Sequence, residues 1–218
     1  MALSDALVGG WGTDRKGRRV CTSRFNPAWL GELGIDPAVI FDVGSYDGAD
    51  ALRLKDKFPK AIVVSVEGDP IRAAAIRKSL VGEDIIFIEA AISDEVGTVE
   101  WYQGGDRSEF GSKNGSIFRW IKKPVREPDK VPCTTLAAIC AARGIIKIDL
   151  IHMDVEGAEL FAMRGLGTIQ ARLVWAEVAN AWPDAPGPIA THAEFLSMGY
   201  IQIAAAGSDR LYLGDGRC

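Results

Sequence analysis

The chain has 218 residues, of which 48% are hydrophobic and 25% are charged. This length and composition fit one well-buried α/β domain, so we expect residues 1–218 to form a single domain. The formal net charge of -4 argues against general binding of nucleic acid, because domains that bind nucleic acid usually carry a clustered positive excess.

Apolar runs are short throughout the chain, and none approaches the roughly 20 residues that a membrane span needs. The N-terminal segment places its charges after a short, weakly apolar stretch, which is not a secretory signal pattern. We therefore expect a cytoplasmic protein without a membrane span. Cys21, Cys133, Cys140 and Cys218 are scattered and form no C-x-x-C pair, so neither a zinc site nor a disulfide framework is indicated. No pattern indicates an oligomeric state.

Short apolar runs alternate with amphipathic stretches, which is typical of a mostly parallel sheet with helices on both faces. A polar arm, residues 1–36, precedes them and is a candidate lid. The predicted elements in chain order are strand 39–43, helix 49–58, strand 61–66, helix 70–80, strand 85–89, short strand 98–102, helix 135–143, strand 148–153, helix 158–164, strand 173–178, helix 192–198 and strands 200–205 and 210–213. Asp69 is a suitable N-cap with Pro70 at the first helical position, and Thr134 or Thr135 can cap the third helix.

The segment 103–132 has no periodicity, is rich in glycine and proline, and is longer than a simple connector. Because variable loops over a rigid sheet often determine specificity, we predict it to be a loop that recognises the second substrate. One tryptophan and four basic residues cluster within it: Trp120, Arg119, Lys122, Lys123 and Arg126. This cluster indicates either an anionic, phosphorylated or nucleotide-linked ligand or a solvated charged face.

A glycine turn follows the first predicted strand. Gly44 and Gly48 bracket Ser45-Tyr46-Asp47 and allow the backbone to approach a ligand closely. The string differs from G-x-G-x-x-G, because Tyr46 occupies the middle glycine position and Asp47 lies where a pyrophosphate would bind. The turn therefore disfavours NAD and FAD.

Two acids complete this pattern. Asp42, at the end of the first strand, is suited to a cationic amino-acid tail, either directly or through water. Glu67 ends the second strand 25 residues later, where a carboxylate can accept both hydroxyls of a ribose. A cofactor with adenine, ribose and a zwitterionic tail but no phosphates is S-adenosylmethionine. A glycine turn and an incidental acid also occur for purely structural reasons, but their joint spacing favours the cofactor.

Five segments carry a resemblance to a known family: VIFDVGSYDGAD, VVSVEGDP, IIFIEAAISDEVGTVEWY, DLIHMDVEGAEL and LVWAEV. In this order they resemble the FkbM-type methyltransferases over about residues 39–180, and the glycine turn and the DVEGAE string are the most specific parts. The resemblance implies an α/β, Rossmann-like class I methyltransferase fold. Its sheet has seven strands, is mostly parallel with an antiparallel C-terminal strand, and has helices on both faces. It also implies S-adenosylmethionine as cofactor and a hydroxyl of a sugar, glycan or secondary metabolite as acceptor.

The resemblance transfers the family's cofactor pattern onto this chain, with Glu89 and Ala90 expected to border the adenine and Asp154 to face the methyl-transfer centre. The predicted cofactor-binding residues are Asp42, Gly44, Ser45, Tyr46, Gly48, Glu67, Gly68, Glu89, Ala90 and Asp154. Two positions depart from the family. His152 replaces the usual lysine before the DVEG aspartate, and Leu136-Ala137 replaces Leu-Asp at the start of the preceding helix.

An alcohol must lose its proton as it accepts a methyl group, so a nearby base or a metal could assist the reaction. We predict that Asp154, together with Glu156 or His152, has this catalytic role. Glu156 has a second interpretation as an acid that stabilises a helix N-terminus, and His152 has one as a hydrogen-bonded core histidine. Glu177, Asp154 and Glu156 are carboxylates at neighbouring strand ends, which suit a hard divalent metal, but their spacing is not a recognised ligand motif. A divalent metal is therefore conceivable but not favoured, and we assign no metal ligands.

Three functions remain open on the sequence. The leading one is O-methylation of a small molecule or glycan by an S-adenosylmethionine-dependent enzyme. The second is a methyltransferase for nucleic acid or a nucleotide-linked substrate. Methylation of base amino groups usually requires Asn- or Asp-Pro-Pro-aromatic after the fourth main strand, and this chain has Asp154-Val155-Glu156-Gly157 there. The third is a catalytically silent module that binds S-adenosylmethionine, which the departures at His152 and Ala137 leave open.

Overall fold

The computed structural model describes residues 34–103, 115–119, 127–178, 184–206 and 208–214, together with Leu30 and two short N-terminal strands. These strands are β1 (Trp11–Thr13) and β2 (Arg19–Cys21), which pair antiparallel as a separate two-stranded sheet. The sequence pattern had indicated only a polar arm in this region.

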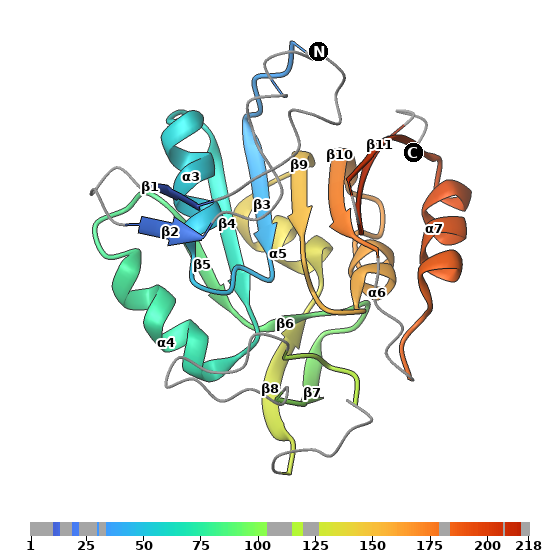
Figure 1. Cartoon of the computed structure of the whole chain (residues 1–218), viewed down its shortest axis with the longest axis horizontal. Helices are drawn as coiled ribbons and strands as arrows, with labels where there is room; N and C mark the ends of the chain where they lie inside the picture. Colours follow the sequence, from blue (N-terminus) through green and yellow to red (C-terminus); the bar gives the residue numbers. More distant parts are fainter. Residues whose placement is uncertain are drawn as a thin grey trace.

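The main sheet has seven strands in the order β11-β12-β10-β9-β3-β4-β5 (Figure 1). Their bounds are β3 (Val39–Val43), β4 (Ile62–Glu67), β5 (Ile86–Glu89), β9 (Lys147–Met153), β10 (Gln170–Glu177), β11 (Tyr200–Ala206) and β12 (Asp209–Gly214). Six of these strands run in the same direction, and β12 runs antiparallel to both of its neighbours, β10 and β11. This arrangement confirms the predicted seven-stranded, mostly parallel sheet with one antiparallel strand near the C-terminus.

Helices cover both faces of the sheet because the strand side chains alternate between two buried layers. Phe41 of β3 packs in the layer that contains Leu136 of α5 (Leu136–Arg143), Ala162 of α6 (Glu159–Arg164) and Phe195 of α7 (Pro188–Ser197). The neighbouring Ile40 packs in the opposite layer against α3 (Ala49–Lys57), and α4 (Pro70–Ser79) packs on α3. Among the described residues, no helix is long and apolar enough to cross a membrane.

The helix starts follow the capping chemistry that the sequence predicted. Asp69 Oδ1 accepts a hydrogen bond from the backbone N–H of Ile71 at 2.8 Å, with Pro70 at the first helical position of α4. Thr135 Oγ1 accepts from the N–H of Ala138 at 3.0 Å and so caps α5. Such a cap contributes on the order of 1 kcal/mol, and the cap at Asp69 fixes the direction in which α4 leaves β4.

A three-stranded sheet differs from the prediction for the segment 103–132. Its order is β6 (Ala91–Ile92), β8 (Asp129–Thr134) and β7 (Gly97–Trp101), and it lies below the main sheet in Figure 1. The end of the predicted loop is therefore strand. Pro132 obscured it because proline is uncommon inside strands. It is tolerated here since β6 pairs with β8 only at Cys133 and Thr134.

Other boundaries move by a few residues. Helix α7 begins at Pro188 rather than at residue 192, because Pro188 occupies the first helical position after Gly187. Strand β10 begins at Gln170 rather than at residue 173, because it pairs with the first residues of β9. Tertiary pairing, which the local pattern does not show, extends β10, whereas a local proline signal accounts for the earlier start of α7.

Candidate active site

Two hollows meet at the carboxyl ends of the central strands, where open α/β sheets bind ligands. The central pocket has a volume of about 90 Å³ and lies between the ends of β3, β4 and β9. Its walls are formed by Val43, Gly44, Tyr46, Val66, Glu67, Gly68, Asp69, Arg72, Ala90, Ala91, Ile92, Trp101, Gly115, Ile117, Asp154, Val155, Glu156 and Ala158. The side cleft, of about 210 Å³, is formed by His152, Met153, Asp154, Trp175, Glu177, Ser208 and Asp209. Asp154 belongs to both.

Gly44 forms the floor of the central pocket in a conformation that favours glycine. Its φ is 82°, and a Cβ at this position would lie 1.8 Å from the backbone oxygen of Asp154. The N–H of Gly44 donates to Val66 O and the N–H of Asp154 donates to Val43 O, each at 2.9 Å. These bonds hold the ends of β3, β4 and β9 so close together that a side chain at residue 44 would not fit.

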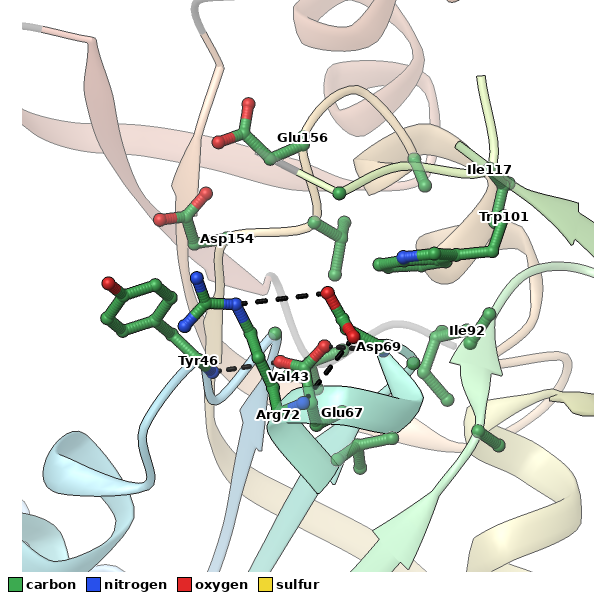
Figure 2. A pocket seen from close by; sticks show the side chains of 18 residues that line it. Val43, Tyr46, Glu67, Asp69, Arg72, Ile92, Trp101, Ile117, Asp154 and Glu156 are labelled. Carbon is green, nitrogen blue, oxygen red and sulfur yellow. Dashed lines mark hydrogen bonds and ion pairs between the residues drawn. The ribbon is translucent and has the colours of Figure 1, made fainter. Parts of the chain in front are cut away.

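Tyr46 lies at the mouth of the turn. It has a positive φ of 54°, and the centroid of its ring lies 3.6 Å from the guanidinium carbon of Arg72. Figure 2 shows the two groups next to each other. Gly48, with φ 78°, is the residue from which α3 starts. Of the predicted turn residues, Gly44 and Tyr46 line the central pocket, whereas Ser45 and Gly48 do not.

Glu67 is the acid of the central pocket, and only 5% of it is exposed. Its Oε2 accepts from the N–H of Tyr46 at 2.9 Å, and its Oε1 accepts from the N–H of Asp69 at 2.8 Å (Figure 2). The two hydrogen bonds fix the carboxylate plane. Burial nevertheless raises the pKa of Glu67 to about 7.

The raised pKa of Glu67 predicts how stability depends on pH. The folded protein holds this proton more tightly than the unfolded chain, so stability falls as pH rises from about 4.5, the ordinary pKa of a glutamate, to about 7. Burial also raises the pKa of Glu159 to about 7, and this contributes with the same sign. We expect the Tm of the free protein to drop by on the order of 5 °C over this interval in a thermal melt. Glu67→Gln should flatten the slope, and a Tm that rises with pH would contradict the assignment.

Trp101, the last residue of β7, supplies a wall that sequence reasoning missed. A Cβ at Gly68 would lie 2.7 Å from its indole ring, and one at Gly115 would lie 2.6 Å from it. The ring therefore fills a slot between two glycines. Asp69, Arg72 and Ile92 were also missed as pocket residues, because the sequence indicated only a helix cap at Asp69 and gave no signal for Arg72 in the first turn of α4 or for Ile92 in the two-residue strand β6.

Of the two residues predicted to border the adenine, Glu89 and Ala90, the structure places one in the central pocket and one outside it. Ala90 lines the central pocket. Glu89 does not, because its exposed carboxylate forms an ion pair with Arg77 of α4. Gly68 lines the pocket beside Ala90, as the sequence indicated.

Asp42 is not brought to the pocket wall that the sequence prediction assigned to it. It is fully buried, its Oδ1 lies 2.8 Å from Nδ1 of His152, and its Oδ2 accepts from Ser45 Oγ at 2.6 Å. Burial opposes protonation of His152, but the hydrogen bond that its Nδ1–H donates to Asp42 and the charge of Asp50 outweigh it and raise the pKa of His152. Asp42 and Ser45 therefore pack beneath the turn, and His152 is the buried hydrogen-bond partner of Asp42.

Three carboxylates gather where the two hollows meet. The carboxylate oxygens of Asp154, Glu156 and Glu177 lie within 4.8 Å of one another. Asp154 is exposed as a whole residue. Its carboxyl group is nevertheless crowded by the cleft walls and by the charges of Glu177 and Glu156, and its pKa is raised well above the ordinary value. Such a group either shares a proton or holds a hard cation.

The remaining sequence predictions concern segments that the structure covers only in part. Ser116 Oγ donates to the carbonyl of Glu156 at 2.9 Å, so part of the predicted acceptor loop borders the site. Arg119 is exposed, whereas residues 120–126, with the rest of the basic cluster, lie outside the described residues. Most of the predicted lid, residues 1–36, lies outside them too.

Comparison with known proteins agrees with this geometry. The family model described as "Methyltransferase FkbM domain" matches residues 42–200. Over 143 residues the chain is 35% identical to 2-O-methyltransferase NoeI of Sinorhizobium fredii (strain NBRC 101917 / NGR234), a match that covers 60% of this chain and 57% of that protein. The chain thus spans little more than half the length of this relative.

Two solved structures show the fold alone. A precorrin-6y C5,15-methyltransferase from Geobacter metallireducens GS-15 has a TM-score of 0.51 at 11% identity, covering 93% of this chain and 91% of that one. The fibrillarin pre-rRNA processing protein of Methanococcus jannaschii has a TM-score of 0.50 at 12% identity, covering 84% and 68%. The family match extends over most of the chain and includes the glycine turn, Glu67 and the acidic turn after β9. The chain belongs to the FkbM methyltransferase family.

Proposed function

We propose that this protein transfers the methyl group of S-adenosylmethionine to a hydroxyl of a sugar, glycan or secondary metabolite. One observation carries the proposal: Asp154 forms part of both the central pocket and the side cleft. A donor in the first and an acceptor in the second would meet at this residue. Such alignment of the two reactants is the main contribution that a protein makes to methyl transfer.

The central pocket supports the donor half of the proposal. Bound S-adenosylmethionine supplies a methyl group that its sulfonium charge has already activated. Glu67 presents a fixed carboxylate to the two ribose hydroxyls, and Gly44 and Gly68 allow the backbone of Asp154 and the ring of Trp101 to pack closely on either side of the pocket. Tyr46, Ala90 and Asp154, predicted from the sequence, form further parts of the wall.

The side cleft supports a neutral acceptor. Its polar wall consists of Asp154, Glu177, Asp209, Ser208 and His152. Carboxylates accept hydrogen bonds from hydroxyl groups, whereas they repel phosphates. This acid-rich wall favours a neutral polyhydroxyl compound over a phosphorylated or nucleotide-linked one. The name of the relative NoeI, a 2-O-methyltransferase, also points to a hydroxyl acceptor.

Of the three predicted catalytic groups, Asp154 is supported best as the base. It touches both hollows, and its raised pKa makes its carboxylate a stronger base than an ordinary aspartate. Glu156 is close enough to share that proton. His152 lines the side cleft, but its Nδ1 is hydrogen-bonded to Asp42. This contact favours a structural role for His152 in the cleft wall over a role as the base.

The test is to incubate the protein with S-adenosylmethionine that carries a deuterated methyl group and a panel of neutral sugars, oligosaccharides, phenols and sugar phosphates. Mass spectrometry should find the label on a hydroxyl of a neutral compound. Glu67→Gln is the control and should lower the yield at limiting cofactor. Label only on phosphorylated compounds would overturn the choice of acceptor. Tight cofactor binding without transfer to any compound would favour the silent module.

A further inference from the structure

Two polar side-chain atoms in the central pocket have no hydrogen-bond partner among the described residues: Nε1 of Trp101 and Oδ2 of Asp69. Only 8% of Trp101 and 1% of Asp69 is exposed, so solvent does not readily satisfy these atoms. Both residues line the pocket, and Figure 2 shows the indole nitrogen and the carboxylate turned into it. An unmade hydrogen bond at a buried atom is costly, so a bound ligand is the natural partner for both.

The surrounding contacts explain why neither atom has a hydrogen-bond partner within the part of the chain that the structure describes. Asp69 uses Oδ1 to cap α4, which fixes the carboxylate. The nearest cation to Oδ2, Nε of Arg72, lies 4.0 Å away, beyond hydrogen-bond distance. Trp101 is held between Gly68 and Gly115, so its indole cannot turn to another acceptor. One fixed donor and one fixed acceptor therefore face the same pocket.

This pair matches the edge of an adenine ring. Adenine carries an amino group that donates, next to ring nitrogens that accept. Asp69 follows Glu67 by two residues, so a ribose held by Glu67 would place its base beside Asp69. Ala91, Ile92 and Ile117 add apolar walls for the faces of the ring.

We propose that Asp69 Oδ2 accepts a hydrogen bond from the amino group of the cofactor's adenine and that Trp101 Nε1–H donates to the neighbouring ring nitrogen. This assignment rests on the proposed function, because it takes S-adenosylmethionine as the ligand. It makes Asp69 and Trp101 the residues that determine base specificity, in place of Glu89. A base with a carbonyl at the same position, such as hypoxanthine, would set its oxygen against the Asp69 carboxylate.

Calorimetry with two product analogues tests the assignment. S-inosylhomocysteine differs from S-adenosylhomocysteine in that a carbonyl replaces the adenine amino group and the adjacent ring nitrogen N1 carries a proton. The native protein should bind the adenosyl compound at least about tenfold more tightly. Asp69→Asn keeps one oxygen for the helix cap and places an amide N–H₂ where Oδ2 lies. This variant should reduce the preference to within about threefold or reverse it.

Matched variants separate base recognition from folding. Asp94→Asn changes an exposed aspartate outside both hollows and should keep the native preference. Trp101→Phe removes the N–H donor while keeping an aromatic ring between the glycines, and should weaken adenosyl binding by about fivefold or more. A thermal melt of each variant checks that it is folded.

The outcomes distinguish this inference from the proposed function. A folded Asp69→Asn protein with the native preference for adenine overturns the assignment to Asp69 and leaves the proposed function intact. If Asp69→Asn does not fold, native affinity in Trp101→Phe overturns the paired recognition in the same way. Failure of the native protein to bind S-adenosylhomocysteine at all overturns the proposed function and this inference together.

Discussion

Gly44→Ala should abolish binding of S-adenosylhomocysteine and destabilise the fold by at least about 3 kcal/mol. The new Cβ would lie 1.8 Å from the backbone oxygen of Asp154, and neither backbone can withdraw, because both are hydrogen-bonded across the strand ends. Separating the strands would also move Asp154, which stands where the two hollows meet. Denaturant unfolding measures the stability, and calorimetry measures the binding.

Gly82→Ala is the matched control for Gly44→Ala. Gly82 has nearly the same φ, 79°, but no atom lies within 4 Å of a Cβ built at this position. The control therefore measures only the strain of a left-handed alanine, about 1–2 kcal/mol, and should leave binding unchanged. If the two variants lose equal stability and both still bind, close approach of the strands at Gly44 is not what makes glycine necessary.

The sequence predicted features that depend on local patterns. The apolar run of residues 39–43 predicted β3 with its observed bounds, and Asp69 and Thr135 cap their helices as expected. The resemblance to FkbM methyltransferases is confirmed by the family match. These predictions succeeded because the residues that determine each feature are close together in the chain.

The sequence could not show contacts between distant segments. Trp101 fills the slot beside Gly68 because β7 pairs with β8, and neither β8 nor the slot has a sequence pattern of its own. Ala91 and Ile92 form part of the same wall through β6, a strand too short to show periodicity. Three of the eighteen residues that line the central pocket, Ala91, Ile92 and Trp101, therefore come from the small sheet, which sequence analysis largely missed.

Asp42 shows how strand geometry can alter a role that a motif suggests. In the register of the main sheet, Asp42 is the direct neighbour of His152. Along β3, residues 41 and 43 pack in one core layer and residue 40 in the other. Alternation therefore places the Asp42 side chain on the layer that α3 covers, where it binds His152 and Ser45. The motif identified the position of Asp42, but the pleat of the strand determines that its side chain packs beneath the glycine turn and does not line the central pocket.

Asp154→Asn should lower the rate of methyl transfer by about 10²–10⁴-fold while S-adenosylhomocysteine affinity changes little. Asparagine keeps the shape of the side chain but cannot take a proton from the acceptor. Because the pKa of Asp154 is raised, the rate of the native protein should increase as pH rises through that pKa and then reach a plateau. The rate of the variant should not show this increase with pH. Single-turnover rates measured across pH test both statements. A native rate and pH profile in Asp154→Asn would remove Asp154 as the base.

Glu177→Gln distinguishes a base from a metal ligand. The negative charge of Glu177 helps to raise the pKa of Asp154. Removing it should therefore shift the increase in rate to lower pH and leave the plateau rate nearly intact. Exhaustive chelation should have no effect on the native rate if Asp154 acts as a base without a metal. If chelation stops the reaction and Mg²⁺ or Mn²⁺ restores it, the three carboxylates are metal ligands. Glu177→Gln should then lower the plateau rate, because the metal is bound more weakly. A shift of the pH profile at an unchanged plateau rate thus indicates a base, and a lower plateau rate indicates a metal ligand.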